Sequence, residues 1–259
     1  MARVTVTADK TAMSAAAAER VCLLIEAAIG ERGRAALSLT GGDTPDLLYQ
    51  MLADDQRPWR RRIDWPHVHL FWGDEREVPP DHRDSNYGLA DRTLLQHVNV
   101  PDNQIHRMRG ELPASDAGRL YDAVLHAWRD QTAGPLFDVM LLGIGSNVHI
   151  ASIFPNSPLL TEEEISATNA RRPPLLAIGL AIPELSQWRI TMTPAALLDS
   201  VHIIMIASGT SKADAIEAAI ERPLDVPRYP AQLLRAADER VEWIMDSGAA
   251  SRLHGAPRA

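Results

Sequence analysis

The sequence predicts an α/β fold with a mostly parallel central sheet and helices on both of its faces. Short apolar runs alternate with longer stretches of helical pattern along the whole chain. The run at 137–145, "FDVMLLGIG", is the most strand-like and is apolar on both faces, as in the middle of a parallel sheet. No repeat or convincing linker divides the 259 residues, so we expect one domain over 1–259.

Local patterns support each expected element in turn. The run "RVTVTA" at 3–8 predicts a strand, and the apolar periodicity of 13–33 predicts a helix that ends near Gly30 or Gly33. Ser85 is a suitable N-cap for a helix at 85–98. The other elements expected before the central strand are strands at 35–39 and 67–72 and helices at 45–53 and 115–131.

The pattern continues after the central strand. We expect strands at 174–182, 188–193, 201–208 and 240–246, a short helix from Pro194, and helices at 211–220, 230–235 and 247–253.

Composition excludes several classes of protein. The net charge is −8, and the densest basic run, 57–62, is interpreted as exposed surface, so we expect no nucleic-acid partner. No window approaches the ~18 apolar residues of a membrane span. The N-terminus lacks a signal-peptide core, which predicts a cytoplasmic protein. The single cysteine, Cys22, lies in an apolar helical pattern and is predicted to be a buried structural thiol.

Ligands of open parallel sheets bind beyond the carboxyl ends of the strands, so the residues directly after each strand are the first candidates for a site. After 35–39 come Gly41, Gly42, Asp43 and Thr44. We expect Thr44 to cap the next helix, with Pro45 as its first residue, and the free amides of this helix start favour an anion such as phosphate. A plain tight turn is the alternative, and an inward Asp43 carboxylate would repel phosphate.

A further strand is followed by charged residues. Asp74, Glu75 and Arg76 stand at the end of strand 67–72, either as an ion-pair network or to hold an arginine for an anionic substrate. His67 and His69 in that strand are interpreted as strand-face residues rather than metal ligands.

His149 and Lys212 come after two more candidate strands. His149 comes after 137–145 among glycines and small residues, where a histidine can take a proton from water. Lys212 falls in the first turn of a helix that we expect Ser211 to cap; a cation is disfavoured there unless an anion binds nearby. A structural histidine and a solvent-facing lysine are the alternatives. Together these segments indicate an enzyme that acts on a phosphorylated small molecule.

The chain resembles the 6-phosphogluconolactonase family along nearly its whole length. "FWGDEREVPPDHRDSNYG" matches the Trp-Gly-Asp-Glu-Arg block with its downstream Ser-Asn-Tyr and is the most specific match. "LTGGDTPDLLY" resembles the Gly-Gly-x-Thr-Pro segment, and "LLGIGSNVHIASIFP" the segment that contains Asp-Gly-His-Thr. Weaker matches are "RITMTPAALL", "SGTSKADAI", "YPAQLLR" and "VEWIMDSGAA".

The resemblance implies a modified Rossmann-like fold and hydrolysis of 6-phosphoglucono-1,5-lactone to 6-phosphogluconate, in the oxidative pentose phosphate pathway, without metal or cofactor. His149 would be the general base on water. The cations Arg76, Arg189 and Lys212 would lie near the substrate, and the amides of Gly41 to Thr44 would cradle its phosphate. Asp74 and Asn147 would support them. The partner would be the sugar-phosphate lactone, without nucleic acid or membrane, and the protein a monomer or small homo-oligomer.

The chain departs from the family pattern around the base. Asn147, Val148 and Ile150 replace the Asp, Gly and Thr of the Asp-Gly-His-Thr segment. Val148 is strained if its position requires a positive φ. A weakly active or inactive sugar-phosphate-binding homologue is therefore an alternative. A deaminase or isomerase is a third, although Ile153, Phe154 and Pro155 occupy the region where deaminases carry a glutamate.

Overall fold

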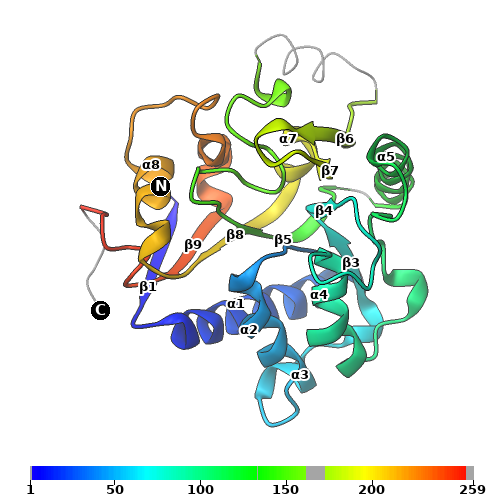
Figure 1. The fold of residues 1–259 in the computed structure, drawn as a ribbon. Helices are drawn as coiled ribbons and strands as arrows, with labels where there is room; N and C mark the ends of the chain where they lie inside the picture. Colours follow the sequence, from blue (N-terminus) through cyan, green and yellow to red (C-terminus); the bar gives the residue numbers. More distant parts are fainter. Residues whose placement is uncertain (1, 133, 162–172, 255–259) are drawn as a thin grey trace.

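The centre of the molecule is a parallel sheet of six strands (Figure 1). The computed structural model describes residues 2–132, 134–161 and 173–254. The strands follow the order β1-β9-β8-β5-β2-β3, and every neighbouring pair is parallel. β5 lies between β8 and β2, so its predicted place in the middle of the sheet is confirmed. The bounds are β1 Arg3–Thr7, β2 Ala35–Leu39, β3 Val68–Trp72, β5 Phe137–Gly143, β8 Ser200–Ala207 and β9 Val241–Asp246.

A second, antiparallel sheet of three strands was not separated from the first by the sequence patterns. It has the order β4-β7-β6, with β4 at Asp74–Arg76, β6 at Ala177–Ile182 and β7 at Gln187–Met192. The acidic-basic run expected at the end of the preceding strand is therefore a strand of its own. Gly73 joins the two sheets: its N–H donates to Leu39 O (3.1 Å), and its carbonyl accepts from Met192 N (2.9 Å).

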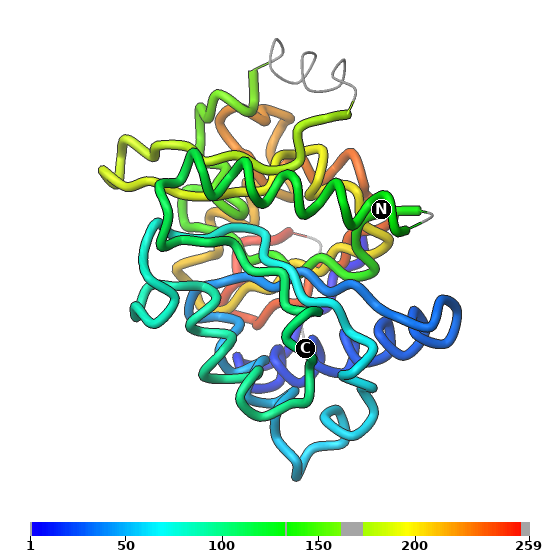
Figure 2. The backbone as a smooth tube through the Cα atoms, turned by 90° about the vertical axis from the view of Figure 1, so that its right-hand side faces the viewer, coloured from blue at the N-terminus to red at the C-terminus, as the bar shows by residue number. Residues whose placement is uncertain are grey.

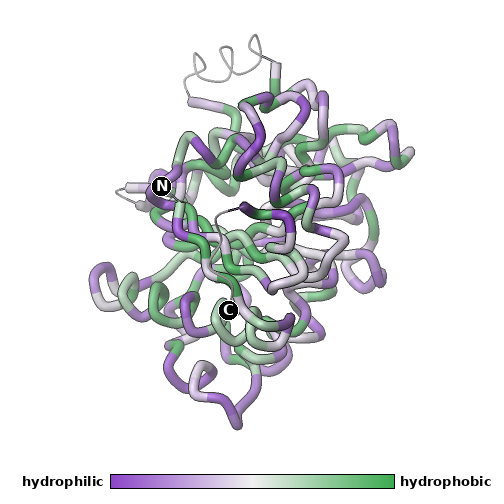
Figure 3. Tube along the Cα trace, turned by 90° about the vertical axis from the view of Figure 1, so that its left-hand side faces the viewer, coloured by the Kyte–Doolittle hydropathy of each residue, from purple (hydrophilic) through white to green (hydrophobic). Residues whose placement is uncertain are grey.

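Helices cover both faces of the central sheet, as predicted (Figure 2). α1 (Lys10–Arg32), α2 (Asp43–Ala53), α3 (Pro58–Arg62) and α4 (Asn86–Thr93) pack with one set of strand side chains, which includes Leu37 and Leu39. α5 (Ala114–Gln131), α7 (Pro194–Leu197) and α8 (Ala213–Ile220) pack with the opposite set and with the small sheet. The hydrophobic stretches gather in the interior strands (Figure 3).

Two buried tyrosines hold the strand ends that carry the site. Tyr49 of α2 donates its hydroxyl to Thr40 O (2.7 Å) and accepts from Thr40 N (2.9 Å). From the other face, Tyr121 of α5 makes the same pair of bonds with Trp72, at 3.1 and 3.0 Å. Thr40 follows β2, and Trp72 is the last residue of the edge strand β3. The two tyrosines therefore fix the carboxyl ends of both strands through main-chain groups that would otherwise lack a partner.

Several local predictions are confirmed. Ser85 caps α4 by accepting from Gly88 N (2.9 Å), Gly33 ends α1 in the left-handed conformation, and Cys22 is fully buried. Short 3-10 helices connect the elements: Trp65–His67, Leu95–His97, Asp102–Gln104, Pro158–Leu160, Pro183–Leu185, Thr210–Lys212 and Pro230–Arg240.

Other local predictions are wrong. Residues 247–253 form turns rather than a helix. His67 lies in a 3-10 turn before β3, so it does not share a strand with His69. The basic run 57–62 is not simply exposed surface, since it contains α3 with buried Trp59, and Arg62 bridges Glu19 and Glu26. Among the described helices none is long and apolar enough to cross a membrane.

Candidate active site

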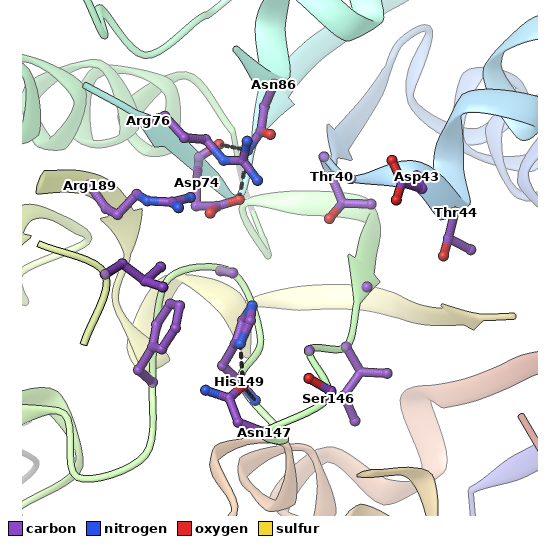
Figure 4. Close-up of a pocket in the computed structure, with 18 of the residues that line it drawn as sticks. Thr40, Asp43, Thr44, Asp74, Arg76, Asn86, Ser146, Asn147, His149 and Arg189 are labelled. Carbon is purple, nitrogen blue, oxygen red and sulfur yellow. Dashed lines mark hydrogen bonds between the residues drawn. The ribbon is translucent and has the colours of Figure 1, made fainter. Parts of the chain in front are cut away.

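The site residues predicted from the sequence meet in one cavity of about 390 Å³, beyond the carboxyl ends of β2, β3, β5 and β8 (Figure 4). All ten contribute to its lining: Gly41, Gly42, Asp43, Thr44, Asp74, Arg76, Asn147, His149, Arg189 and Lys212. Figure 4 shows Arg76, Asp74 and Arg189 on one side, Thr40, Asp43 and Thr44 on another, and His149 on a third. The cavity is thus lined by cations and main-chain donors around one histidine.

A tight turn after β5 carries His149. Val148 N donates to Gly145 O, and Gly145 N donates to His149 O, both at 2.9 Å. Gly145 is required, because a Cβ there would lie 2.1 Å from the His149 ring. Val148 has a φ of +70°, so the position where the resemblance places a glycine does take the left-handed conformation. A β-branched residue is strained there by roughly 1–2 kcal/mol.

Asn147 determines which nitrogen of His149 is protonated. Its Oδ1 lies 2.5 Å from His149 Nδ1 and also accepts from the His149 main-chain N–H at 3.4 Å. A main-chain N–H can only donate, so the amide oxygen faces the ring and Nδ1–H is the second donor. Nε2 then keeps its lone pair, and this nitrogen points across the cavity toward Asp74 and Arg189 (Figure 4).

The surroundings of His149 keep it neutral. Its ring stacks on Phe154, with centroids 4.2 Å apart and an interplanar angle of 10°. Burial lowers the pKa of His149 to about 4; the negative charge of Asp74 opposes this shift, while the charges of Lys212, Arg189 and Arg76 add to it. The imidazole is therefore an unprotonated base at neutral pH.

Two arginines face each other in the small sheet. Arg76 of β4 is the direct register partner of Arg189 of β7. Like charges directly opposite in an antiparallel pair are unfavourable. Neither forms an ion pair within the described part of the chain; Arg76 donates to Asp84 O and Arg189 to Gln187 Oε1. Burial, followed by the charge of Arg76, lowers the pKa of Arg189. This pair is suited to an anionic group of a ligand.

Asp74 links three parts of the site. Its Oδ1 accepts from Asn86 Nδ2 (3.0 Å) and its Oδ2 from Ser152 Oγ (2.6 Å). Asn86 in turn packs so closely on Gly41 that a Cβ there would lie 1.8 Å from Asn86 Oδ1. Sequence reasoning missed Asn86 and Ser152 as site residues. The Ser-Asn-Tyr and Ala-Ser segments contained them, but only the fold shows that both reach Asp74.

Glu75 resolves the question of the three adjacent charges. Its carboxylate accepts from the main-chain N–H groups of Asn86 and Tyr87 (both 2.8 Å) and from Ser85 Oγ (3.0 Å). It therefore caps the start of α4, where a helix favours negative charge. Asp74 and Arg76 on either side of it are left to line the cavity.

The opposite side of the cavity contains two helix starts. α2 begins at Asp43 with Gly42 as N-cap at a φ of +93°, so the predicted cap at Thr44 and first position at Pro45 are wrong. α8 begins at Ala213, and no side chain caps it, which also contradicts the predicted cap at Ser211. At α2 the lack of a side-chain cap leaves the first main-chain N–H groups available to an anion, whereas at α8 the N–H groups of Lys212 and Ala213 donate to Gly209 O and Thr210 O of the preceding 3-10 turn.

Lys212 is the N-cap residue of α8 and lines the cavity. Burial lowers its pKa, and the Asp43 carboxylate opposes that shift. The loop before it is held from behind by Asp246, which accepts from Ser208 Oγ (2.5 Å) and Gly209 N (2.9 Å).

Fold and site together define an α/β protein with a cavity lined by cations and main-chain donors at the carboxyl edge of a parallel sheet. The family model described as glucosamine-6-phosphate isomerases/6-phosphogluconolactonase matches residues 8–243. The chain belongs to this family of enzymes.

Individual relatives agree with the family model. The 6-phosphogluconolactonase of Mycobacterium tuberculosis is 35% identical over 258 residues, which cover 95% of this chain and 96% of the relative. That of Haemophilus influenzae is 33% identical, with 82% and 85% covered. The solved structure of 6-phosphogluconolactonase from Trypanosoma brucei has a TM-score of 0.79 at 27% identity and covers 98% of this chain and 99% of that one.

Proposed function

We propose that the protein hydrolyses 6-phospho-D-glucono-1,5-lactone to 6-phosphogluconate, as a step of the oxidative pentose phosphate pathway. The observation that carries the proposal is the placement of His149: its ring stacks on Phe154, its Nδ1 meets Asn147 Oδ1, and its Nε2 faces a cavity with two arginines that form no ion pair within the described residues. The names and coverage of the relatives support the same substrate.

The geometry supports a division of labour. The N–H groups at the start of α2 and the Lys212 ammonium hold the phosphate. The lactone ring then extends toward Arg76 and Arg189, which stabilise the oxyanion that forms at C1. His149 Nε2 takes a proton from water as the water oxygen attacks C1. The ring C–O bond then breaks, and the imidazolium returns its proton to the leaving ring oxygen. No metal or cofactor takes part in this sequence.

Hydrolysis by the purified protein tests the proposal directly. Freshly prepared lactone should disappear faster with the protein than by spontaneous hydrolysis, and a His149→Ala variant should lose roughly 10²-fold or more in rate. No acceleration by the wild-type protein, together with retained binding of 6-phosphogluconate, would instead show a sugar-phosphate-binding homologue. The left-handed Val148 and the uncharged Asn147 beside the base are the observations that favour this second candidate.

The third candidate is an amino-sugar-phosphate deaminase. A monomeric glucosamine-6-phosphate deaminase shares the fold with a TM-score of 0.76, but at 23% identity the likeness extends to the fold alone. Release of ammonia from glucosamine 6-phosphate would support this activity.

The proposal also covers the setting of the enzyme. We place it in the cytoplasm, as one domain over 1–259 that acts as a monomer or small homo-oligomer without nucleic-acid or membrane partners. Light scattering on the purified protein measures the oligomeric state.

A further inference from the structure

Lysine is rare in this protein and confined to one place. Of its 26 lysine and arginine residues only Lys10 and Lys212 are lysines. Lys212 lines the cavity and interacts with the Asp43 carboxylate. Lys10 comes from the opposite end of the chain, and its Nζ donates to Asp43 O at 2.7 Å. Both lysines therefore converge on the residue that begins α2.

Both lysines also occupy helix positions that are unfavourable for a cation. Lys10 is the first residue of the long helix α1 and follows Asp9, whose carboxylate caps the helix by accepting from Ala12 N (2.9 Å). Lys212 is the N-cap residue of α8. The partial positive charge of a helix N-terminus disfavours a cation at either position. The Asp9 carboxylate offsets this cost at Lys10, whereas no side chain caps α8 at Lys212, where a bound anion would offset it.

The bond to Asp43 O orients a main-chain donor. In a trans peptide the C=O and the next N–H point in opposite directions. With its oxygen held by Lys10, the Asp43–Thr44 peptide directs Thr44 N–H away from Lys10, and Thr44 lines the cavity. The ammonium also places a second positive charge behind this donor. A phosphate monoester carries up to two negative charges, which matches two lysines.

We propose that Lys10 is a positioning residue of the phosphate subsite, which holds the start of α2 for a dianionic phosphate ester while Lys212 contacts it. This inference rests on the proposed function, because it assigns the α2 side of the cavity to the phosphate. The rival explanation is that Lys10 only neutralises Asp43.

Kinetics and binding with matched variants test the proposal. Lys10→Gln removes the positive charge and shortens the side chain that donates to Asp43 O. Arg61→Gln, the matched control, removes one charge from an exposed position of α3. We expect Lys10→Gln to raise KM for the phosphorylated lactone by about tenfold, as for loss of a charge-assisted hydrogen bond, with kcat within about twofold of wild type. The dissociation constant of inorganic phosphate should rise by the same factor. Values equal to those of Arg61→Gln, or a fall in kcat alone, would overturn the proposal.

The same substitution in an Asp43→Asn protein separates a role of Lys10 in the phosphate subsite from simple neutralisation of Asp43. If Lys10 only neutralised Asp43, Lys10→Gln would have no effect on phosphate affinity in an Asp43→Asn protein. We expect the same loss in both backgrounds, because the bond is to the main-chain oxygen.

Selective labelling gives a readout that does not depend on turnover. Reductive methylation with ¹³C-formaldehyde labels only two lysines and the N-terminal amine, and Lys10→Arg identifies one of the signals. Inorganic phosphate should shift both lysine signals; a shift of the Lys212 signal alone would contradict the proposal. Since this experiment uses no lactone, an inactive wild-type protein would count against the proposed function and not against the role of Lys10.

Discussion

Ser152 Oγ lies 2.6 Å from Asp74 Oδ2, and this bond joins the turn that carries His149 to the strand that carries Arg76. Both side chains are buried, with Ser152 fully inaccessible and Asp74 7% exposed. Asn86 on the other carboxylate oxygen extends the connection to the glycines after β2. The histidine, the arginines and the helix start of α2 are thus held in one hydrogen-bonded frame.

Ser152→Ala should reduce catalysis strongly, although it removes only one hydroxyl group. The buried Asp74 carboxylate loses a donor, so unfolding free energy should fall by about 1–3 kcal/mol. The His149 turn loses its anchor, and kcat should fall roughly tenfold to a hundredfold. Ser157→Ala in the same segment, a serine that caps a 3-10 turn instead, is the control and should keep its kcat. A wild-type kcat in Ser152→Ala would contradict the frame.

Substitutions at Val148 should change stability in an order that differs from the usual one for a buried valine. Elsewhere a buried valine replaced by glycine loses more stability than the same valine replaced by alanine, by about 1 kcal/mol. At a φ of +70° only glycine is free of strain, and its relief is worth about 1–2 kcal/mol. Both variants lose the packing of a side chain that is 5% exposed. Urea unfolding should therefore show Val148→Gly at least as stable as Val148→Ala. If Val148→Ala were instead more stable than Val148→Gly by about 1 kcal/mol, backbone strain at this position would be refuted.

Asn147→Asp should strengthen the base. A carboxylate against Nδ1–H favours the imidazolium, so the pKa of His149 rises above its value of about 4. The acid limb of the kcat/KM profile then moves to higher pH. Because a stronger base transfers a proton more readily, kcat at neutral pH should rise about threefold to tenfold. An unchanged acid limb would mean that His149 does not set it. Asn147→Leu removes the acceptor and should lower kcat.

Acid should destabilise the protein through a histidine pair outside the site. His106 Nε2 lies 3.2 Å from His69 Nδ1, and burial, with the charge of His69, lowers the pKa of His106 to about 4. The folded state therefore favours the neutral ring. Its contribution to stability is complete above the unfolded pKa of about 6.5 and is lost as the pH falls toward 4.

Urea unfolding at about pH 7.5 and about pH 5 measures this effect. Since the ring is partly exposed, the loss assigned to His106 should be on the order of 1 kcal/mol. His106→Phe should abolish that share, and the exposed His97→Gln should keep it. Equal pH dependence in both variants would rule out His106 as the source.

The geometry of strand ends in a parallel sheet explains why so much of the site was predictable. Residues after β2, β5 and β8 meet at one edge whatever their distance in sequence, so Gly41, His149 and Lys212 could be placed together from the sequence alone. Short apolar runs likewise predicted all six parallel strands, but they did not separate β6 and β7 into a second sheet.

The contacts that were missed depend on geometry that no local pattern encodes. β4 has only three residues, too few for a periodicity, and its identity as a strand depends on β7, more than a hundred residues later. The N-caps expected at Thr44 and Ser211 are wrong because residue type alone does not fix where a helix begins. α2 begins at Asp43, after Gly42 with its positive φ, and α8 begins at Ala213. Asn86 and Ser152 gain their role only from a shared carboxylate.

Gly73 connects the two sheets through a single residue, with one main-chain bond into each. The side of the cavity with the arginines and the side with the helix starts are consequently joined by two main-chain bonds at this residue, and we expect these bonds to hold the distance between the two sides. Under the proposed function, a fixed distance between the two sides would select substrates by their length. A phosphate ester of a shorter sugar lactone would reach one side or the other, but not both.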